Sequence, residues 1–256
     1  MKNIIEIKSA SNDKFKFFKS LLTKKGRDES GQYMVEGIKS VKEALNSQRN
    51  IEAVIIKEGL ACDIGQVTCP MYVMPQMLTD RLSDTKSPQG IYAVINKLNK
   101  DIQLKKDGAY VYCDRVSDPG NLGTIIRTAD SAGFEGVLLS PDCVEVHNPK
   151  TVRSCMGSFF RMEVIENVDP GFLRAYSETD GKIYGGILSG DTKDYRSVDY
   201  KGSVMIVVGN EATGISEPVQ KICTPVKIPI YGGAESLNVA VAASILMYEA
   251  ANSRHK

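Results

Sequence analysis

Residues 228–250 read IPIYGGAESLNVAVAASILMYEA, in which a Gly-Gly pair precedes a run without charged residues from Ser236 to Tyr248. A membrane-spanning helix needs about 18 or more consecutive apolar residues, and this run is shorter. We therefore expect no membrane anchor here. Two alternatives remain for this stretch: a buried core helix that begins with a good cap, or one wall of a binding site.

The composition is typical of a globular protein. The chain has 256 residues, 42% hydrophobic and 25% charged, enough for one large domain or two ordinary ones. Its N-terminus, MKNIIEIKSASNDK, lacks the apolar run of a signal peptide. The six cysteines show no CxxC pair or zinc-type spacing, which favours reduced thiols in a cytoplasmic protein. With only His147 and His255 present, we expect no metal site and no Cys-His nucleophile.

The charges are distributed unequally along the chain. Residues 1–106 hold 18 Lys and Arg against 12 Asp and Glu, a net charge of +6, whereas the remainder holds 14 against 19, a net charge of −5. Clustered positive charge attracts polyanions by Coulomb forces and counterion release. A solvated helix face would look the same, so the charge alone leaves both interpretations open. The candidate contacts near the N-terminus with a polyanion such as a nucleic acid are Lys14, Lys16, Lys24, Lys25 and Arg27.

Two parts are predicted, 1–98 and 108–256, joined by a polar linker at 99–107. Both alternate helices with short apolar strands, so an α/β fold is expected, and the second part predicts a mostly parallel sheet covered on both faces. In the first part we expect helices at 11–25 and 38–45 and strands at 33–35, 51–56, 72–74 and 90–94. In the second we expect strands at 109–113, 136–140, 161–165, 182–188, 203–208 and 224–230, and helices at 121–132, 149–158, 169–177, 216–222 and 236–252.

Three loops of the second part each contain glycine and lead from a strand into a helix. They begin after the strands 109–113, 203–208 and 224–230. In parallel sheets such loops meet at the carboxyl edge, where ligands bind. Each also has a purely structural interpretation, because Asn121, Ser216 and Ser236 are good helix N-caps. Neither GxGxxG nor GxxxxGK[ST] occurs, which disfavours a Rossmann dehydrogenase and a P-loop NTPase.

Taken together, the loops resemble a known family. DPGNLGTIIRTADSAGF (118–134), IVVGNEATGIS (206–216) and IPIYGGAESLNVAVAASILMYE (228–249) are similar to the three motifs of the SpoU (TrmH-like) ribose methyltransferases of the SPOUT superfamily. NPKTVRSCMGSFFRM (148–162) resembles the segment between the first two motifs. Less strongly, the first 95 residues resemble the substrate-binding domain that precedes the catalytic domain in many of these enzymes, a small α/β fold like that of RNA-binding ribosomal proteins.

This resemblance implies an α/β catalytic domain with a deep trefoil knot, working as a homodimer in which two protomers complete the active site. It implies methyl transfer from S-adenosylmethionine to a ribose 2′-hydroxyl of structured RNA, with ribosomal RNA favoured over tRNA. A non-catalytic RNA-binding or ribosome-assembly factor that kept the fold is the alternative. Neither function requires a membrane or a metal.

The resemblance also implies roles for individual residues. The catalytic residues that match the motifs are Asn121, Arg127, Glu211, Ser236 and Asn238. The cofactor-binding positions, largely through backbone groups, are Leu188, Ser189, Gly209, Ile228 and Leu237. Arg127 or Glu211 could take the hydroxyl proton, or orient other groups while water or a phosphate oxygen accepts it. The motifs leave the proton acceptor open.

Overall fold

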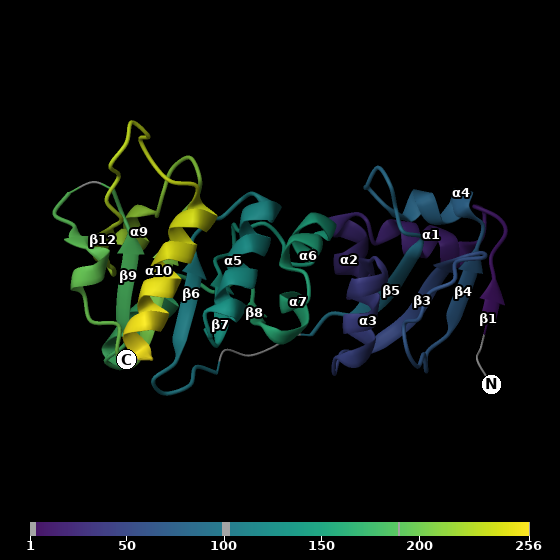
Figure 1. The fold of residues 1–256 in the computed structure, drawn as a ribbon, viewed down its shortest axis with the longest axis horizontal. Coiled ribbons are helices and arrows are strands. Elements are labelled where there is room, and N and C mark those ends of the chain that lie inside the picture. Colours follow the sequence, from purple (N-terminus) through teal and green to yellow (C-terminus); the bar gives the residue numbers. More distant parts are fainter. Residues whose placement is uncertain (1–3, 99–102, 189, 256) are drawn as a thin grey trace. The chain divides into compact units, whose positions relative to one another are not determined.

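The computed structural model describes residues 4–98, 103–188 and 190–255. These residues form two compact units (Figure 1). The first comprises the described part of Met1–Asn99 together with His147–Phe160, and the second the described parts of Lys100–Val146 and Arg161–Lys256. The sequence motifs assign 147–160 to the predicted domain 108–256, whereas its packing groups it with the N-terminal unit.

The first unit is built on a five-stranded mixed sheet in the order β1-β4-β3-β5-β2. Strand β5 runs antiparallel to β2 and β3, and β4 runs parallel to β3 and β1. The elements of residues 4–96 are β1 (Ile4–Glu6), α1 (Asp13–Ser20), α2 (Lys24–Ser30), β2 (Gln32–Glu36), α3 (Ile38–Asn46), β3 (Ile51–Lys57), β4 (Met71–Met74), α4 (Gln76–Thr79), η1 (Asp80–Leu82) and β5 (Ile91–Asn96).

The single helix predicted over 11–25 is wrong, because the chain forms two helices there. Helix α1 ends at Ser20, and Thr23 caps α2 by accepting a hydrogen bond from the Gly26 amide. Gly26 passes so close to the Ser20 carbonyl that a Cβ would overlap with it. The hydrophobic spacing continues through Leu21, which is fully buried, so periodicity alone could not reveal the break.

The second unit contains a seven-stranded sheet in the order β10-β12-β9-β11-β6-β7-β8, and all its pairings are parallel, as predicted. The elements of residues 109–254 are β6 (Ala109–Cys113), α5 (Pro119–Ser131), β7 (Gly136–Leu139), α6 (Pro149–Cys155), α7 (Ser158–Arg161), β8 (Glu163–Ile165), α8 (Gly171–Glu178), β9 (Lys182–Gly186), β10 (Lys193–Asp194), η2 (Tyr195–Ser197), β11 (Val204–Val208), α9 (Glu217–Gln220), β12 (Thr224–Lys227) and α10 (Val239–Arg254).

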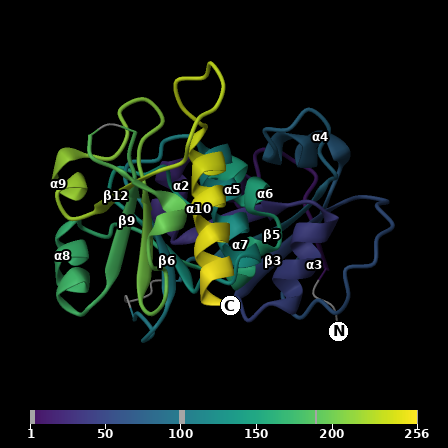
Figure 2. The same ribbon diagram turned by 60° about the vertical axis from the view of Figure 1, so that its left-hand side comes forward.

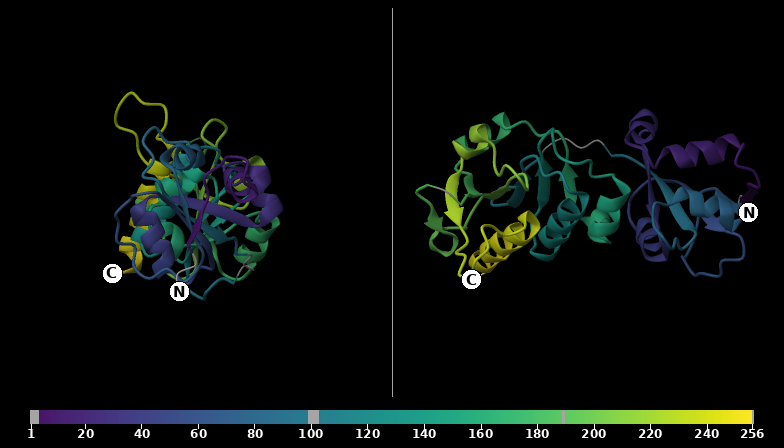
Figure 3. Two further views of the ribbon diagram at one scale, coloured as in Figure 1. Left: turned by 90° about the vertical axis from the view of Figure 1, so that its right-hand side faces the viewer. Right: turned by 90° about the horizontal axis from the view of Figure 1, so that it is seen from above.

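Both faces of this sheet are covered. On one face Tyr112 and Val207 pack with Leu173 of α8 and Val219 of α9 in one buried cluster. On the other face α5 and α10 lie side by side along the central strands (Figures 1 and 3). Since all strands are parallel, the loops after β6, β11 and β12 reach the same edge. No helix in the described ranges is long and apolar enough to cross a membrane.

Candidate active site

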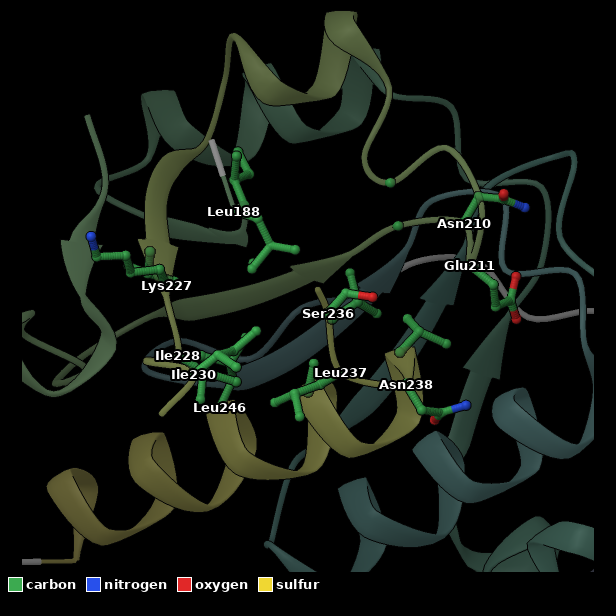
Figure 4. A pocket seen from close by; sticks show the side chains of 18 of the residues that line it. Leu188, Asn210, Glu211, Lys227, Ile228, Ile230, Ser236, Leu237, Asn238 and Leu246 are labelled. Atoms are coloured by element: carbon green, nitrogen blue, oxygen red, sulfur yellow. The ribbon is translucent and has the colours of Figure 1, made fainter. Parts of the chain in front are cut away.

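A pocket of about 460 Å³ opens at this edge of the second unit. The loops after β9, β11 and β12 and the start of α10 line it, and its volume lies within the roughly 300–1,000 Å³ of small-molecule sites. Figure 4 shows a division within it: Ile228, Ile230 and Leu246 gather on one side, while Glu211 and Asn238 lie on the other. The pocket therefore presents an apolar wall and a polar wall to one ligand.

The apolar wall contains most of the residues expected to bind the cofactor. Leu188, Gly209, Ile228 and Leu237 all line the pocket, and Leu188 is 60% exposed. Ser189, the fifth expected position, lies outside the described residues. Backbone edges flanked by apolar side chains suit a flat heterocycle, which needs a few fixed hydrogen-bond partners and exclusion of water from its faces.

Position 209 requires glycine because the backbone packs closely at the end of β11. A Cβ at this position would overlap with the backbone of Gly214 and Ile215, where the loop folds back on itself. Asn210 and Gly214 exchange hydrogen bonds of 2.9 and 3.0 Å across this turn. By contrast, nothing lies within 4 Å of a Cβ at Gly232 or Gly233, so that pair does not provide a close approach.

The polar wall is organised around the Glu211 carboxylate. Its Oε1 accepts hydrogen bonds from Asn121 Nδ2 at 2.9 Å and from the Asp118 amide at 3.1 Å. Its Oε2 accepts from Ser117 Oγ at 2.9 Å and from the Ser117 amide at 3.2 Å. Asn238 Nδ2 in turn donates to Asn121 Oδ1 at 3.0 Å. Three motifs far apart in sequence are thus joined into one network.

These contacts fix the ionisation of Glu211. Partial burial raises the pKa of this carboxyl, but the hydrogen bonds from Asn121 and from the backbone of the 117–118 loop outweigh it and lower the pKa to about 2. Glu211 is therefore charged throughout the neutral range. Because both oxygens already accept two hydrogen bonds each, the carboxylate is built to hold the loop and Asn121 rather than to take up a proton.

Two of the expected helix caps are wrong. Asp118, not Asn121, caps α5, and its side chain accepts a hydrogen bond from the Asn121 amide. Asn238, not Ser236, caps α10 by accepting from the amides of Ala240 and Val241. This leaves the Asn121 side chain free of capping and able to bridge Glu211 and Asn238. Ser236 lines the pocket two residues before the helix cap.

Comparison with known proteins identifies the family. The sequence profile described as "SpoU rRNA Methylase family" matches residues 108–248, and that described as "MRM3-like substrate binding domain" matches residues 12–93. The chain belongs to the SpoU rRNA methylase family. This confirms the resemblance inferred from the three motifs.

Individual rRNA methyltransferases match the chain along nearly its whole length. The 23S rRNA (guanosine(2553)-2'-O)-methyltransferase RlmP of Bacillus subtilis is 34% identical, over 95% of this chain and 98% of its own. The 23S rRNA (uridine(2479)-2'-O)-methyltransferase of Streptomyces viridochromogenes is 27% identical, over 96% and 92%. The AdoMet-bound rRNA methyltransferase of Sinorhizobium meliloti is 31% identical with a TM-score of 0.86, over 97% of each chain.

Arg127, the remaining SpoU motif residue, stands apart from the pocket. It lies on α5, is exposed and does not line the pocket. Helix α5 is held against α10 by the hydroxyls of Thr128 and Ser244, which lie 3.0 Å apart. The structure therefore brings together Asn121, Glu211, Ser236 and Asn238 but leaves Arg127 on the outer surface of the same unit.

Sequence reasoning missed several residues that support the SpoU site. Asn210 Nδ2 donates to the Arg115 carbonyl at 2.9 Å, and Arg115 Nη2 donates to the Gly214 carbonyl at 3.1 Å. Buried Asp114 accepts from the Ser216 amide at 2.5 Å. These bonds tie the loop after β6 to the loop after β11. The available signal was a pair of polar residues directly after a buried strand, Asp114-Arg115.

The basic residues near the N-terminus differ in their surroundings. Lys14, Lys16, Lys24 and Lys25 are exposed on α1 and α2. Arg27 is only 2% exposed, and its Nη1 donates to the Leu21 carbonyl at 2.9 Å. The prediction that Arg27 contacts RNA is therefore at odds with the structure, because its guanidinium is used to fix the α1–α2 connection.

Proposed function

We propose that this protein transfers a methyl group from S-adenosylmethionine to a ribose 2′-hydroxyl in ribosomal RNA. The observation that carries the proposal is the pocket in which an apolar wall faces the Glu211–Asn121–Asn238 network. Membership of the SpoU family supports it, as do the names of the relatives, which act on 23S rRNA, and the AdoMet-bound neighbour.

The residues present fit the cofactor. The adenosyl group would lie against Ile228, Leu237 and Leu246, with the polar wall beside the reacting centre. When bound, S-adenosylmethionine supplies a methyl group on a positively charged sulfur that is an excellent leaving group. The protein therefore mainly needs to hold the ribose 2′-hydroxyl in line for attack on the methyl group and to prevent other orientations of the ribose. The charged Glu211 also suits a cationic neighbour.

Within this proposal, Glu211 is a positioning residue for Asn121. Its low pKa makes it a poor acceptor for a hydroxyl proton. The amides of Asn121 and Asn238 and the Ser236 hydroxyl would hold the ribose. Arg127 would clamp and orient an RNA phosphate, since a neutral guanidine is very costly. The proton would then leave to water or to a phosphate oxygen.

A homodimer is part of the proposal because Arg127 lies away from its own pocket. The surface of α10 exposes Val241 (47%) and Tyr248 (46%), with Ile245 between them, beside α5. A second copy covering this face would bury the apolar stripe and bring in its own Arg127.

The same proposal includes three further predictions. These are the trefoil knot, a cytoplasmic location and the domain limits 1–98, 99–107 and 108–256.

The test is methyl transfer from labelled S-adenosylmethionine to unmodified 23S ribosomal RNA and to tRNA, with the methylated nucleotide mapped afterwards. We expect transfer to ribosomal RNA at one ribose. RNA binding without cofactor binding would instead identify the non-catalytic factor. Arg127→Ala is expected to lose transfer and to keep cofactor affinity, whereas Leu237→Asp is expected to lose both.

A further inference from the structure

We propose that Tyr231 and the cations around it bind the substrate RNA beside the cofactor pocket, with the Tyr231 ring stacked on an unpaired base. This inference rests on the proposed function and names a surface of the catalytic unit that would hold the RNA strand. The residues to which the three family motifs give a role are Asn121, Arg127, Glu211, Ser236 and Asn238, and Tyr231 is not among them.

Tyr231 is placed to meet a ligand outside the pocket. It is 88% exposed, the most of any large hydrophobic side chain identified in the described residues. Its neighbour Ile230 lines the pocket, as does Ser236 at the other end of the same loop. All residues from Tyr231 to Ser236 are exposed, and Figures 1 and 2 show this segment before α10 projecting away from the sheet. The Tyr231 ring is therefore exposed to solvent, and the residue before it lines the pocket.

One cation, Arg196, meets Tyr231, and two more, Lys193 and Lys227, lie on the paired strands β10 and β12. Arg196 interacts with the Tyr231 hydroxyl, and its guanidinium lies 5.4 Å from the centre of the Tyr195 ring. Strand β10 pairs with β12, which places Lys193 opposite Val226 and Asp194 opposite Lys227. Lys227 also lines the pocket.

Two carboxylates belong to the same surface. Asp194 pairs with Arg196 at 3.2 Å, and exposed Glu235 lies on the Tyr231 loop. Lys193, Arg196 and Lys227 balance these two carboxylates and Glu211 of the pocket, so the surface carries no net charge, whereas residues 107–256 as a whole carry −5. The net negative charge of residues 107–256 therefore does not extend to this surface.

An exposed aromatic ring among cations is the chemistry that holds single-stranded nucleic acid. Bases stack on aromatic side chains whatever their sequence, and Lys and Arg neutralise the phosphates between them. A base held on Tyr231 would belong to a nucleotide next to the one whose ribose enters the pocket. That arrangement would separate the nucleotide to be methylated from its neighbours in a structured RNA. It would also fix which nucleotide of the RNA strand enters the pocket.

The absence of tryptophan from the chain gives a direct test. In Tyr231→Trp the new indole is the single tryptophan, so its fluorescence reports the environment of this loop alone. We expect quenching on titration with an unmodified 23S ribosomal RNA transcript and none with S-adenosylmethionine. Phe172→Trp, which places the reporter on α8, is the matched control and should not be quenched by the RNA.

Kinetics on the same transcript test the energetic contribution. We expect Tyr231→Ala to raise the KM for RNA about tenfold, equivalent to about 1.4 kcal/mol, and to leave the Kd for S-adenosylmethionine within about twofold. Tyr231→Phe should stay near wild type. Arg196→Ala should lower the slope of log K against log salt by about 0.7, whereas Arg174→Ala, at an exposed position of α8, should not change it.

The outcomes separate this inference from the proposed function. If wild type methylates the transcript but Tyr231→Ala has an unchanged KM and Tyr231→Trp is not quenched, the RNA surface is wrong and the proposed function stands. Equal loss of cofactor affinity in Tyr231→Ala would also overturn it, since the loop would then belong to the cofactor pocket. If wild type binds no S-adenosylmethionine, the proposed function itself fails.

Discussion

At the scale of single residues, the Glu211 carboxylate shows how a charge is held for positioning. Its lowered pKa means that the folded state favours the charged form, so its stabilisation is present above the ordinary value near 4.5 and is lost as the pH falls through about 2. We expect the difference in unfolding free energy between wild type and Glu211→Gln to shrink from pH 6 to pH 3. Denaturant melts at several pH values measure it. A constant difference would contradict the assignment.

Gly209 gives a second prediction at this scale. Gly209→Ala must displace the backbone of Gly214, which lines the pocket, and that of Ile215. We expect a loss of S-adenosylmethionine affinity of at least tenfold, measured by calorimetry, together with a lower melting temperature. Gly232→Ala is the matched control, because its Cβ would enter open space and should leave the affinity near that of wild type.

At the scale of elements, one side chain at the start of α10, Asn238, both caps the helix and helps to form the active site. Asn238 caps the helix with Oδ1 and holds Asn121 with Nδ2. Asn238→Ala should lose both, at a stability cost of about 1 kcal/mol. Asn238→Ser keeps a good cap but not the amide donor, so we expect near wild-type melting with transfer still impaired. Full transfer in Asn238→Ser would show that only the cap matters.

Much of the element pattern was predictable from the sequence, and the errors have physical causes. The strands of the parallel sheet followed from continuous apolar runs such as 109–113. The caps did not, because Ser236 and Asn238 are equally good cap residues and only the backbone conformation selects between them. The Glu211–Ser117 contact joins residues on different loops, which no local pattern encodes. The burial of Arg27 was not predicted, because the local sequence pattern does not reveal that its side chain is buried.

At the scale of the whole molecule, the exposed stripe on α10 predicts association of two copies. Val241→Glu combined with Tyr248→Glu places charge on the proposed contact face. We expect monomers in analytical ultracentrifugation, loss of methyl transfer and retention of cofactor affinity. Arg174→Glu on α8 is the control and should remain dimeric. A monomeric wild type with full activity would contradict the dimer.

The basic N-terminal unit gives a further prediction at this scale. Replacing Lys14, Lys16, Lys24 and Lys25 by glutamine should weaken RNA binding at low salt and lower its salt slope by about 0.7–0.9 for each phosphate that is no longer neutralised. Arg27→Ala should instead lower thermal stability, because its guanidinium supports the Leu21 carbonyl inside the unit. Filter binding at several salt concentrations and thermal melts distinguish the two effects. An unchanged slope in the lysine variant would mean that this unit does not bind the RNA phosphates.

The bond between Asn121 and Asn238 has a consequence for the timing of synthesis. The two residues lie on different motifs, and the pocket lining runs from Gly186 to Leu246. During synthesis from the N-terminus, the residues of this pocket are therefore among the last to be made. We expect a nascent chain to form most of its sheet before it forms the binding site for the methyl donor. Catalytic competence arrives only when α10 has left the ribosome. Products terminated before that helix would be inert, and translation through α10 is needed for a chain able to modify RNA.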